Sequence, residues 1–201
     1  MGNGATVGAV LANEHQTIGH LLSVLDRMAK DLGHGPPAEP SRVTQALGLL
    51  GRYGRGLHCA KEEGSLFPEV AADGMPGGGH LVAVLRSQHE AIAALAEAVQ
   101  RASDDLSRGD DRARRPVARG VLVLTALVRR HMDFEESILF PHLRGTFPRA
   151  ASVRVLATFR ALDRASPLAR AVDYEIRFLE NGDGPAHQPA VTRRKRGTRA
   201  R

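Results

Sequence analysis

The sequence predicts an all-α protein: an antiparallel up-and-down four-helix bundle built from two pseudo-symmetric helical hairpins, followed by a C-terminal helical extension. Apolar residues recur at helical spacing and do not alternate with period two, so strands are not indicated. Clusters of Gly and Pro divide the chain into helix-length segments, and one helical motif occurs twice. We expect the bundle over residues 1–148, the extension over 149–184 and a disordered basic tail over 185–201.

Four clusters rich in Pro and Gly set the expected helix ends, because Pro lacks a backbone donor and Gly loses the most backbone freedom in a helix. They lie at residues 33–41, 73–79, 103–111 and 143–150. Each segment between them is long enough for one helix. A further break near Ser166-Pro167 makes the extension one or two helices.

Each of the four segments carries an apolar stripe of helical period. The stripes of the first, third and fourth segments cover 15–29, 82–99 and 117–138. The second stripe is weaker because its glycines lower helix propensity, although they permit close contact between helices. These glycines are Gly48, Gly51, Gly54 and Gly56.

Six ionisable residues lie on these stripes, where the core of the bundle should be. A lone His on such a stripe is usually a hydrogen-bonded core residue, but burying this many unpaired ionisable groups would destabilise the fold severely. A bound metal removes that cost, since neutral imidazole and ionised carboxylate are metal ligands. The candidate metal ligands are His15, His58, Glu62, His89, His131 and Glu135.

The ligand pattern occurs twice. HCAKEEGSLFP at 58–68 and HMDFEESILFP at 131–141 both read H-x-x-x-E-E-x-x-L-F-P, and EHQTI at 14–18 is repeated as QHEAI at 88–92. The His and the first Glu of each motif are four residues apart, so they share a helix face. Two hairpins related by a pseudo-two-fold axis would therefore bring four His and two Glu to the bundle centre.

The number of ligands suggests two metal ions. If Glu62 and Glu135 both bridge, each ion receives two His nitrogens and two carboxylate oxygens, with space for a bridging oxo or hydroxo group and an open position. Mixed nitrogen and oxygen ligands in a helical bundle suit iron, with manganese next. Zinc accepts the same donors but prefers four ligands and has no redox chemistry.

These paired motifs, with His15 and His89 upstream, resemble the hemerythrin-like HHE cation-binding family over residues 14–143. The resemblance implies a non-haem di-iron centre: two iron ions (Fe²⁺/Fe³⁺) with a bridging oxo or hydroxo group, held by the six candidate ligands. It also implies a function, which is to bind or sense O₂, NO or peroxide, or to handle iron. Two alternatives stay open: a metal-stabilised interaction module without redox turnover, and a nucleic-acid-associated protein anchored by its Arg-rich tail.

The sequence departs from the oxygen-carrying hemerythrins. They have a second His one turn beyond the third-helix ligand, where this chain has Ala93, and the matching first-helix position is Gly19. With one His fewer, an iron ion would be more open, which favours a reactive or sensing centre over a reversible carrier. The carriers also bridge with an acid five residues after the fourth-helix His, so Glu136 is the reserve for Glu135.

The other histidines are not expected to be ligands, because they lie on other helix faces, near helix ends or in loops. His20, for example, lies about 140° around the helix from His15, which suits a surface role. These histidines are His20, His34, His80, His142 and His187.

Residues beside the candidate ligands are expected to play other parts. Glu63 and Glu136 should be outer-face charges, with a hydrogen bond to an imidazole as the alternative. Cys59 should be a small packed residue rather than a redox thiol, and Tyr53 is an alternative candidate to donate a hydrogen bond near bound oxygen. The Leu-Phe-Pro triplets at 66–68 and 139–141 should form an apolar plug, with each Pro ending or bending its helix.

Composition limits the function classes. An apolar run of about 18 residues and a basic N-terminal region are both missing, so neither a membrane span nor a secretory signal is expected. The single Cys excludes an internal disulfide framework and a multi-cysteine zinc site, and favours the cytoplasm. Aromatic residues are 4%, without Trp, which argues against a stacking platform for single-stranded nucleic acid.

The positive net charge belongs to the tail. The chain has 28 Lys and Arg against 22 Asp and Glu; six of the 28 lie in 185–201, which leaves 22 basic and 22 acidic residues in the rest. Such a run is a candidate for contact with nucleic acid or an anionic membrane, although a solvated tail is the commoner case. The extension is expected to cap the bundle or mediate a homodimer.

Overall fold

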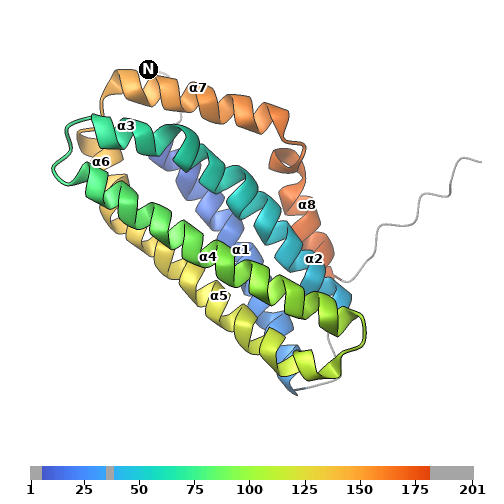
Figure 1. Cartoon of the computed structure of the whole chain (residues 1–201). Helices are drawn as coiled ribbons and strands as arrows, with labels where there is room; N and C mark the ends of the chain where they lie inside the picture. The colour runs from blue at the N-terminus through green and yellow to red at the C-terminus, as the bar shows by residue number, and fades with distance from the viewer. Residues whose placement is uncertain (1–5, 35–38, 182–201) are drawn as a thin grey trace, which may run out of the picture.

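The computed structural model describes residues 6–34 and 39–181, and all the regular structure within them is helical. Long helical segments lie alongside one another, and two further helices cover one side (Figure 1). Three segments, η1, η2 and η4, are π-helical, and η3 is a 3₁₀ turn. In chain order the elements are α1 (Val7–His34), α2 (Pro40–Leu50), η1 (Gly51–Cys59), η2 (Glu62–Leu66), α3 (Phe67–Ala72), α4 (Gly78–Ser107), η3 (Asp111–Ala113), α5 (Arg114–Phe134), η4 (Glu135–Leu139), α6 (Phe140–Gly145), α7 (Arg149–Ala165) and α8 (Leu168–Asn181).

The helix ends lie at the predicted clusters of Pro and Gly. α2 begins with Pro40 in its first turn, where the missing N–H leaves no hydrogen bond unmade. α4 follows Gly77, whose φ of 75° lies in the left-handed region that Gly adopts without strain. The extension breaks between α7 and α8, at Ser166, as predicted.

The prolines of the repeated motif do not end their helices, so the first of the two predicted effects is wrong, and the second, a bend, stays a prediction. The chain stays helical through Pro68 as far as Ala72, and through Pro141 as far as Gly145. Each Pro lies in the first turn of an α-helix that directly follows a π-helical segment. Because the hydrogen-bond pattern changes there, the N–H that Pro lacks is not needed to continue the helix.

The helices enclose two apolar clusters, one on each side of a polar layer. Contacts join α1 to α5, α5 to α4, α4 to α2 and α2 to α1. Along α1, Leu11 belongs to one apolar cluster and Ile18 to the other, and both are buried. His15 lies between them in sequence, so the polar layer crosses the molecule at that level.

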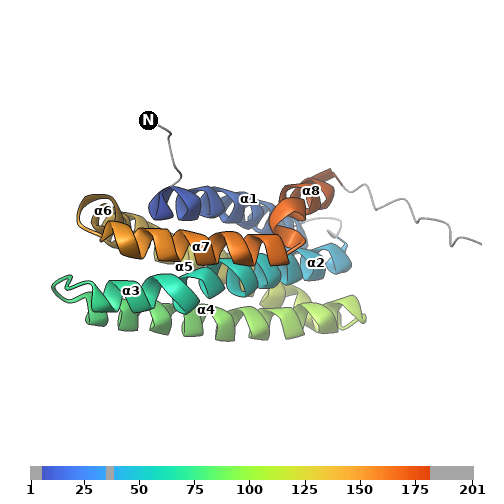
Figure 2. The ribbon, with the colours of Figure 1, turned by 90° about the horizontal axis from the view of Figure 1, so that it is seen from above.

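The C-terminal helices pack on the first half of the chain. α7 contacts α1 and η2, and α8 contacts α1, α2 and η1 (Figure 2). Phe159 of α7 and Ile176 of α8 are buried there. The predicted division between bundle and extension at residue 148 stays a prediction, and the predicted basic tail, 185–201, lies outside the described residues.

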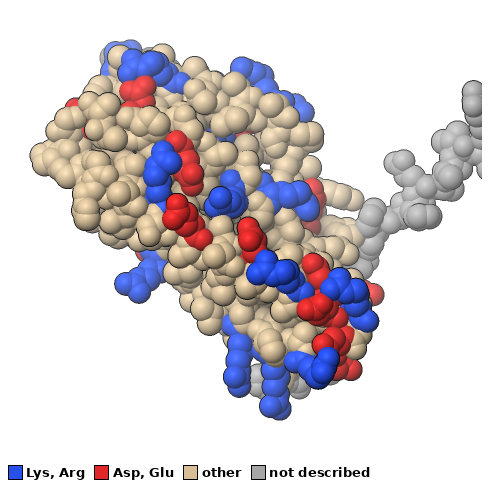
Figure 3. Space-filling view, in the orientation of Figure 1, with Lys and Arg blue, Asp and Glu red and all other residues tan. Residues whose placement is uncertain are grey.

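The distribution of surface charge agrees with the equal numbers of basic and acidic residues outside 185–201. In the view of Figure 3, acidic and basic side chains are interspersed over the visible face rather than gathered by sign. None of the described helices is both long and apolar enough to span a membrane.

We expect Gly120 to be required for the close approach of α5 to α4. A Cβ atom at Gly120 would lie 2.7 Å from Cγ2 of Val99, whereas one at Gly19 in α1 would meet no side chain of the described residues within 4 Å. Ala gains similar helix propensity at both positions, so their difference isolates the contact. Gly120→Ala should have a free energy of unfolding about 1–3 kcal/mol lower than Gly19→Ala, measured by urea denaturation. Equal values for the two variants would show that the helices can separate without cost.

Candidate metal centre

Six buried side chains meet in the polar layer, and they are the six that the sequence singled out. They form two groups, and within each group the potential ligand atoms lie within 4.8 Å of one another. Both carboxylates belong to both groups. Every one of the six side chains is buried. The first group is His15 of α1, His58 of η1, Glu62 of η2 and Glu135 of η4; the second is His89 of α4, His131 of α5 and the same two Glu.

Each carboxylate lies between one imidazole of its own motif and one from the other half of the chain. The second pair of imidazoles also approach each other, with 3.0 Å between the Nε2 atoms of His89 and His131. The distances from imidazole Nε2 to the nearest carboxylate oxygen are 3.5 Å (His58–Glu62), 3.4 Å (His89–Glu62), 3.4 Å (His131–Glu135) and 3.2 Å (His15–Glu135).

Several polar atoms at this centre are buried and have no hydrogen-bond partner among residues 6–34 and 39–181. They are the Nε2 atoms of His15 and His58 and both carboxylate oxygens of Glu62 and Glu135. Buried polar atoms are nearly always hydrogen-bonded, because leaving one unpaired costs about 1–3 kcal/mol. Imidazole nitrogens and carboxylate oxygens that face one another in this way fit metal ions that accept mixed nitrogen and oxygen ligands, such as iron or manganese.

Local helix geometry contributes to this convergence. His58 lies in η1, Glu62 begins η2 and Glu135 begins η4, and all three elements are π-helical. A π-helical turn contains more residues than an α-turn, so it changes which side chains face the bundle centre. The apolar and polar spacing of the sequence fits uniform α-helices and does not predict these turns.

A hydrogen bond at Nδ1 orients each of the four imidazoles. The partner is an acceptor oxygen in every case, so Nδ1 donates and Nε2 is directed at the centre. The prediction that Glu63 and Glu136 are only outer-face charges is therefore wrong, and the alternative, a bond to an imidazole, holds. The four Nδ1–oxygen distances are 2.9 Å (His15–Glu136), 2.9 Å (His58–Glu14), 2.7 Å (His89–Glu63) and 2.8 Å (His131–Gln88).

Two of these orienting residues, Glu14 and Gln88, were missed by the sequence analysis. They occupy equivalent places in the internal repeat, each directly before the first His of its half. Each bonds the second His of the same half, His58 or His131. The repeat of EHQTI as QHEAI aligns Glu14 with Gln88, so the sequence does indicate that these two residues have equivalent roles.

The two halves of the centre differ in charge. Glu14 is ion-paired with Lys61, whose side chain is 1% exposed, and Lys61 also lies 2.5 Å from Asp163 of α7. The residues at the equivalent positions of the second half are Gln88 and Phe134, which carry no charge. The first pair of imidazoles is thus supported by a buried ionic network that includes the C-terminal extension, and the second pair by a neutral amide.

When only the side chains of the centre are considered, bound protons on imidazole and carboxyl groups offset the buried negative charge. Burial lowers the pKa of His58, but the charge of Glu62 and the hydrogen bond to Glu14, together with smaller contributions from other groups, outweigh burial and raise this pKa to about 10. Burial raises the pKa of Glu135 to about 7, and repulsion by Glu62 acts in the same direction. Burial and the neighbouring charge of His89 lower the pKa of His131 to about 3. Protons therefore neutralise the same carboxylates that bound metal cations would neutralise.

Aromatic rings cover one side of the centre. Phe67 stacks on His89 with 5.6 Å between ring centroids, and Phe140 stacks on His15 at 5.3 Å. Leu66 and Leu139, which precede them, have no exposed surface. The apolar plug predicted from the Leu-Phe pairs is present, and it keeps bulk water away from this side of the six side chains.

The other candidate residues lie outside the cluster. His20 is at the surface, 3.0 Å from Glu180, and His142 lies 2.5 Å from Asp73. The side chain of His80 is exposed, whereas Cys59 is half-buried. The predicted roles of His34 and His187 fall on side chains that the structure does not describe.

Tyr53 keeps a protonated hydroxyl. Its side chain is buried, and burial together with the negative charge of Glu14 raises its pKa to about 12. The predicted role of Tyr53, a donor near bound oxygen, stays a prediction.

Comparison with known proteins gives one match. A family model described as the hemerythrin HHE cation binding domain matches residues 6–143. No curated protein matches the chain, and no solved structure matches it.

We expect metal binding to release protons. Burial lowers the pKa of His89, but contacts with Cys59 and Glu62 outweigh it and raise this pKa to about 11; the pKa of His58 is about 10. Both imidazoles are therefore protonated at neutral pH and must lose a proton to ligate a metal. Adding Mn²⁺ to metal-free protein at pH 7.5 should release about two protons per chain, measured with an indicator dye in weak buffer. Because fewer protons are displaced at higher pH, the affinity should rise with pH. Binding without proton release would contradict this account.

The buried Lys61 should contribute strongly to stability. Replacing it with Met leaves Glu14 charged and buried, which we expect to lower the free energy of unfolding by about 3–5 kcal/mol. The double variant Lys61→Met with Glu14→Gln removes the charge that Lys61 no longer neutralises and should recover part of the loss. Urea denaturation of metal-free protein measures both, and a single-variant loss below about 1 kcal/mol would argue against a buried ionic network.

Proposed function

Because the chain belongs to the hemerythrin HHE cation-binding family, we propose that it is a non-haem di-iron protein that binds or senses O₂, NO or peroxide, or handles iron. The observation that carries the proposal is the set of buried imidazole nitrogens and carboxylate oxygens without hydrogen-bond partners. Iron suits this donor set and adds redox chemistry that zinc lacks.

Each group of ligand atoms would hold one ion. His15 and His58 would serve the first ion and His89 and His131 the second, with Glu62 and Glu135 as bridges between the two. This assignment is supported by the sharing of both carboxylates by the two groups. Glu136, the reserve for the bridge, bonds Nδ1 of His15 instead, which favours Glu135 as the bridge.

We further infer that the helices have the up-and-down antiparallel order of a four-helix bundle. The contacts of α1, α2, α4 and α5, each with two of the others, support this order.

Once bound, iron would supply electron transfer and an open position for a small oxidant. The protein's own part is to orient and to shield. Each imidazole donates a hydrogen bond from Nδ1 to a side-chain oxygen, which holds the ring with Nε2 directed inward. The four acceptors are Glu14, Glu63, Gln88 and Glu136. The stacked Phe67 and Phe140 exclude bulk water from one side.

The residues beyond the histidines favour a reactive or sensing centre over a reversible oxygen carrier. Ala93 stands one helical turn after His89, and Gly19 one turn after His15. Neither side chain can ligate a metal. A small molecule therefore has more room at these positions than it would beside a further imidazole.

The proposal predicts two iron ions per chain, bound by these residues. Protein reconstituted with Fe²⁺ should bind both ions and show a near-ultraviolet band that appears on oxidation and changes on reduction. His58→Ala and His131→Ala should each reduce the iron content by at least half, because each removes a ligand from one group. His20→Ala, which removes a surface His paired with Glu180, is the matched control and should keep both ions.

The same measurements distinguish the alternatives. A metal-stabilised interaction module would lose melting temperature in chelator, yet its spectrum would not respond to O₂, NO or peroxide. A nucleic-acid-associated protein would shift DNA in a salt-dependent manner, and deletion of 185–201 would abolish the shift. The cytoplasmic location and the homodimer stay predictions.

A further inference from the structure

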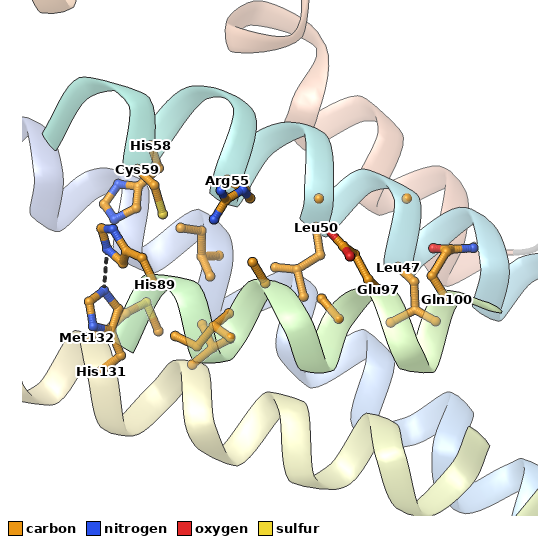
Figure 4. Close-up of a pocket in the computed structure, with 18 of the residues that line it drawn as sticks. Leu47, Leu50, Arg55, His58, Cys59, His89, Glu97, Gln100, His131 and Met132 are labelled. Carbon is orange, nitrogen blue, oxygen red and sulfur yellow. Dashed lines mark hydrogen bonds between the residues drawn. The ribbon is translucent and has the colours of Figure 1, made fainter. Parts of the chain in front are cut away.

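A cavity of about 450 Å³ opens beside the candidate metal centre (Figure 4). His58, His89 and His131 form one end of it, and the other end reaches Leu47 and Gln100. Its volume is within the range of pockets for organic ligands, about 300–1,000 Å³, and far exceeds the needs of a diatomic gas. The walls are mostly apolar.

The cavity exists because two facing helical segments carry small residues. Gly48, Gly51 and Gly54 line one wall, and Ala93 and Ala96 of α4 line the other. Among the described residues, a Cβ atom at Gly48 or Gly54 would meet within 4 Å only Arg52 or Leu50 of the same helical stretch, and one at Gly51 would meet no side chain. The close contact between helices that these glycines were predicted to permit is therefore not made there.

The cavity is long. Along α4 its lining extends from His89 to Arg101, which corresponds to about 18 Å at 1.5 Å per residue. A cavity of this length with mostly apolar walls can hold an extended hydrocarbon chain.

One cation in the cavity wall, Arg55, has no acidic partner within the part of the chain that the structure describes. Arg101 pairs with Glu97 at 4.0 Å on the same helix, and Arg52, outside the cavity, pairs with Glu175 at 2.8 Å. Among the described side chains, by contrast, none forms an ion pair or hydrogen bond with Arg55. Figure 4 shows the guanidinium of Arg55 between the histidine end and Leu50. A guanidinium binds a carboxylate through two parallel hydrogen bonds.

We propose that this cavity binds a medium-chain carboxylate, with its carboxylate on Arg55 and its hydrocarbon chain along Leu50 and Leu47. The head of such a ligand would lie next to His58 and Cys59, and its chain would displace water from the apolar walls. The site depends on the cavity and on Arg55, so it goes beyond the proposed metal chemistry and does not require it.

Isothermal titration of the full-length protein with decanoate tests the site. We expect saturable binding at one site per chain, with 1-decanol and acetate each at least tenfold weaker, since one lacks the charge and the other the chain. Arg55→Gln should weaken decanoate about tenfold, a loss of about 1.4 kcal/mol, and leave 1-decanol unchanged. Arg52→Gln is the matched control and should bind decanoate like the wild type.

Two variants fill the cavity independently. Ala96→Phe and Gly51→Leu should each abolish the binding of decanoate and of 1-decanol, while circular dichroism confirms that each variant is folded. Absence of saturable decanoate binding in the wild type, or undiminished binding in both folded cavity variants, would overturn the proposal. The heat of binding requires no metal, so titrating chelator-treated protein in parallel separates this result from the iron measurements.

Discussion

The two carboxylates at the bundle centre, Glu62 and Glu135, impose the constraint on which the rest of the structure depends. Neither has any exposed surface, and none of their oxygens has a hydrogen-bond partner in the described parts of the chain. Charges buried in this way destabilise a fold unless something neutralises them. The apolar clusters on both sides of the layer supply the burial, and the imidazoles supply nitrogen atoms at distances of 3.2–3.5 Å. The molecule is therefore organised around a shared need for positive charge at its centre.

That need is met differently on the two sides. His58 is oriented by a charged Glu14 that Lys61 neutralises, whereas His131 is oriented by the amide of Gln88. A carboxylate that accepts the Nδ1 hydrogen bond makes the Nε2 atom of the imidazole a more basic metal ligand than an amide does. The two halves repeat in sequence but offer ligands of different basicity, and α7 takes part on one side alone through Asp163.

The sequence predicted the helix ends and the six central residues well, because both follow from local rules. The Pro- and Gly-containing clusters between the segments end helices, and the four-residue spacing brings His58 and Glu62 together, with 3.5 Å between Nε2 and a carboxylate oxygen. The Nδ1 partners were harder to predict, since Glu63 reaches a His from the other half of the chain. The cavity could not be predicted at all: whether facing glycines and alanines close a gap or leave it open depends on the separation of two whole helices.

Glu63 and Glu136 each accept a hydrogen bond from a His of the other hairpin, and this pattern shows how such a centre can be assembled. Glu63 of the first hairpin bonds His89 of the second, and Glu136 of the second bonds His15 of the first. Each hairpin thus supplies a Glu acceptor to a His of the other hairpin. An isologous contact between identical subunits has the same reciprocity. The chain has the design of a symmetric dimer whose two protomers have been fused end to end. After fusion each copy can diverge in sequence. One example is the repeat position that is Lys61 in the first half and Phe134 in the second.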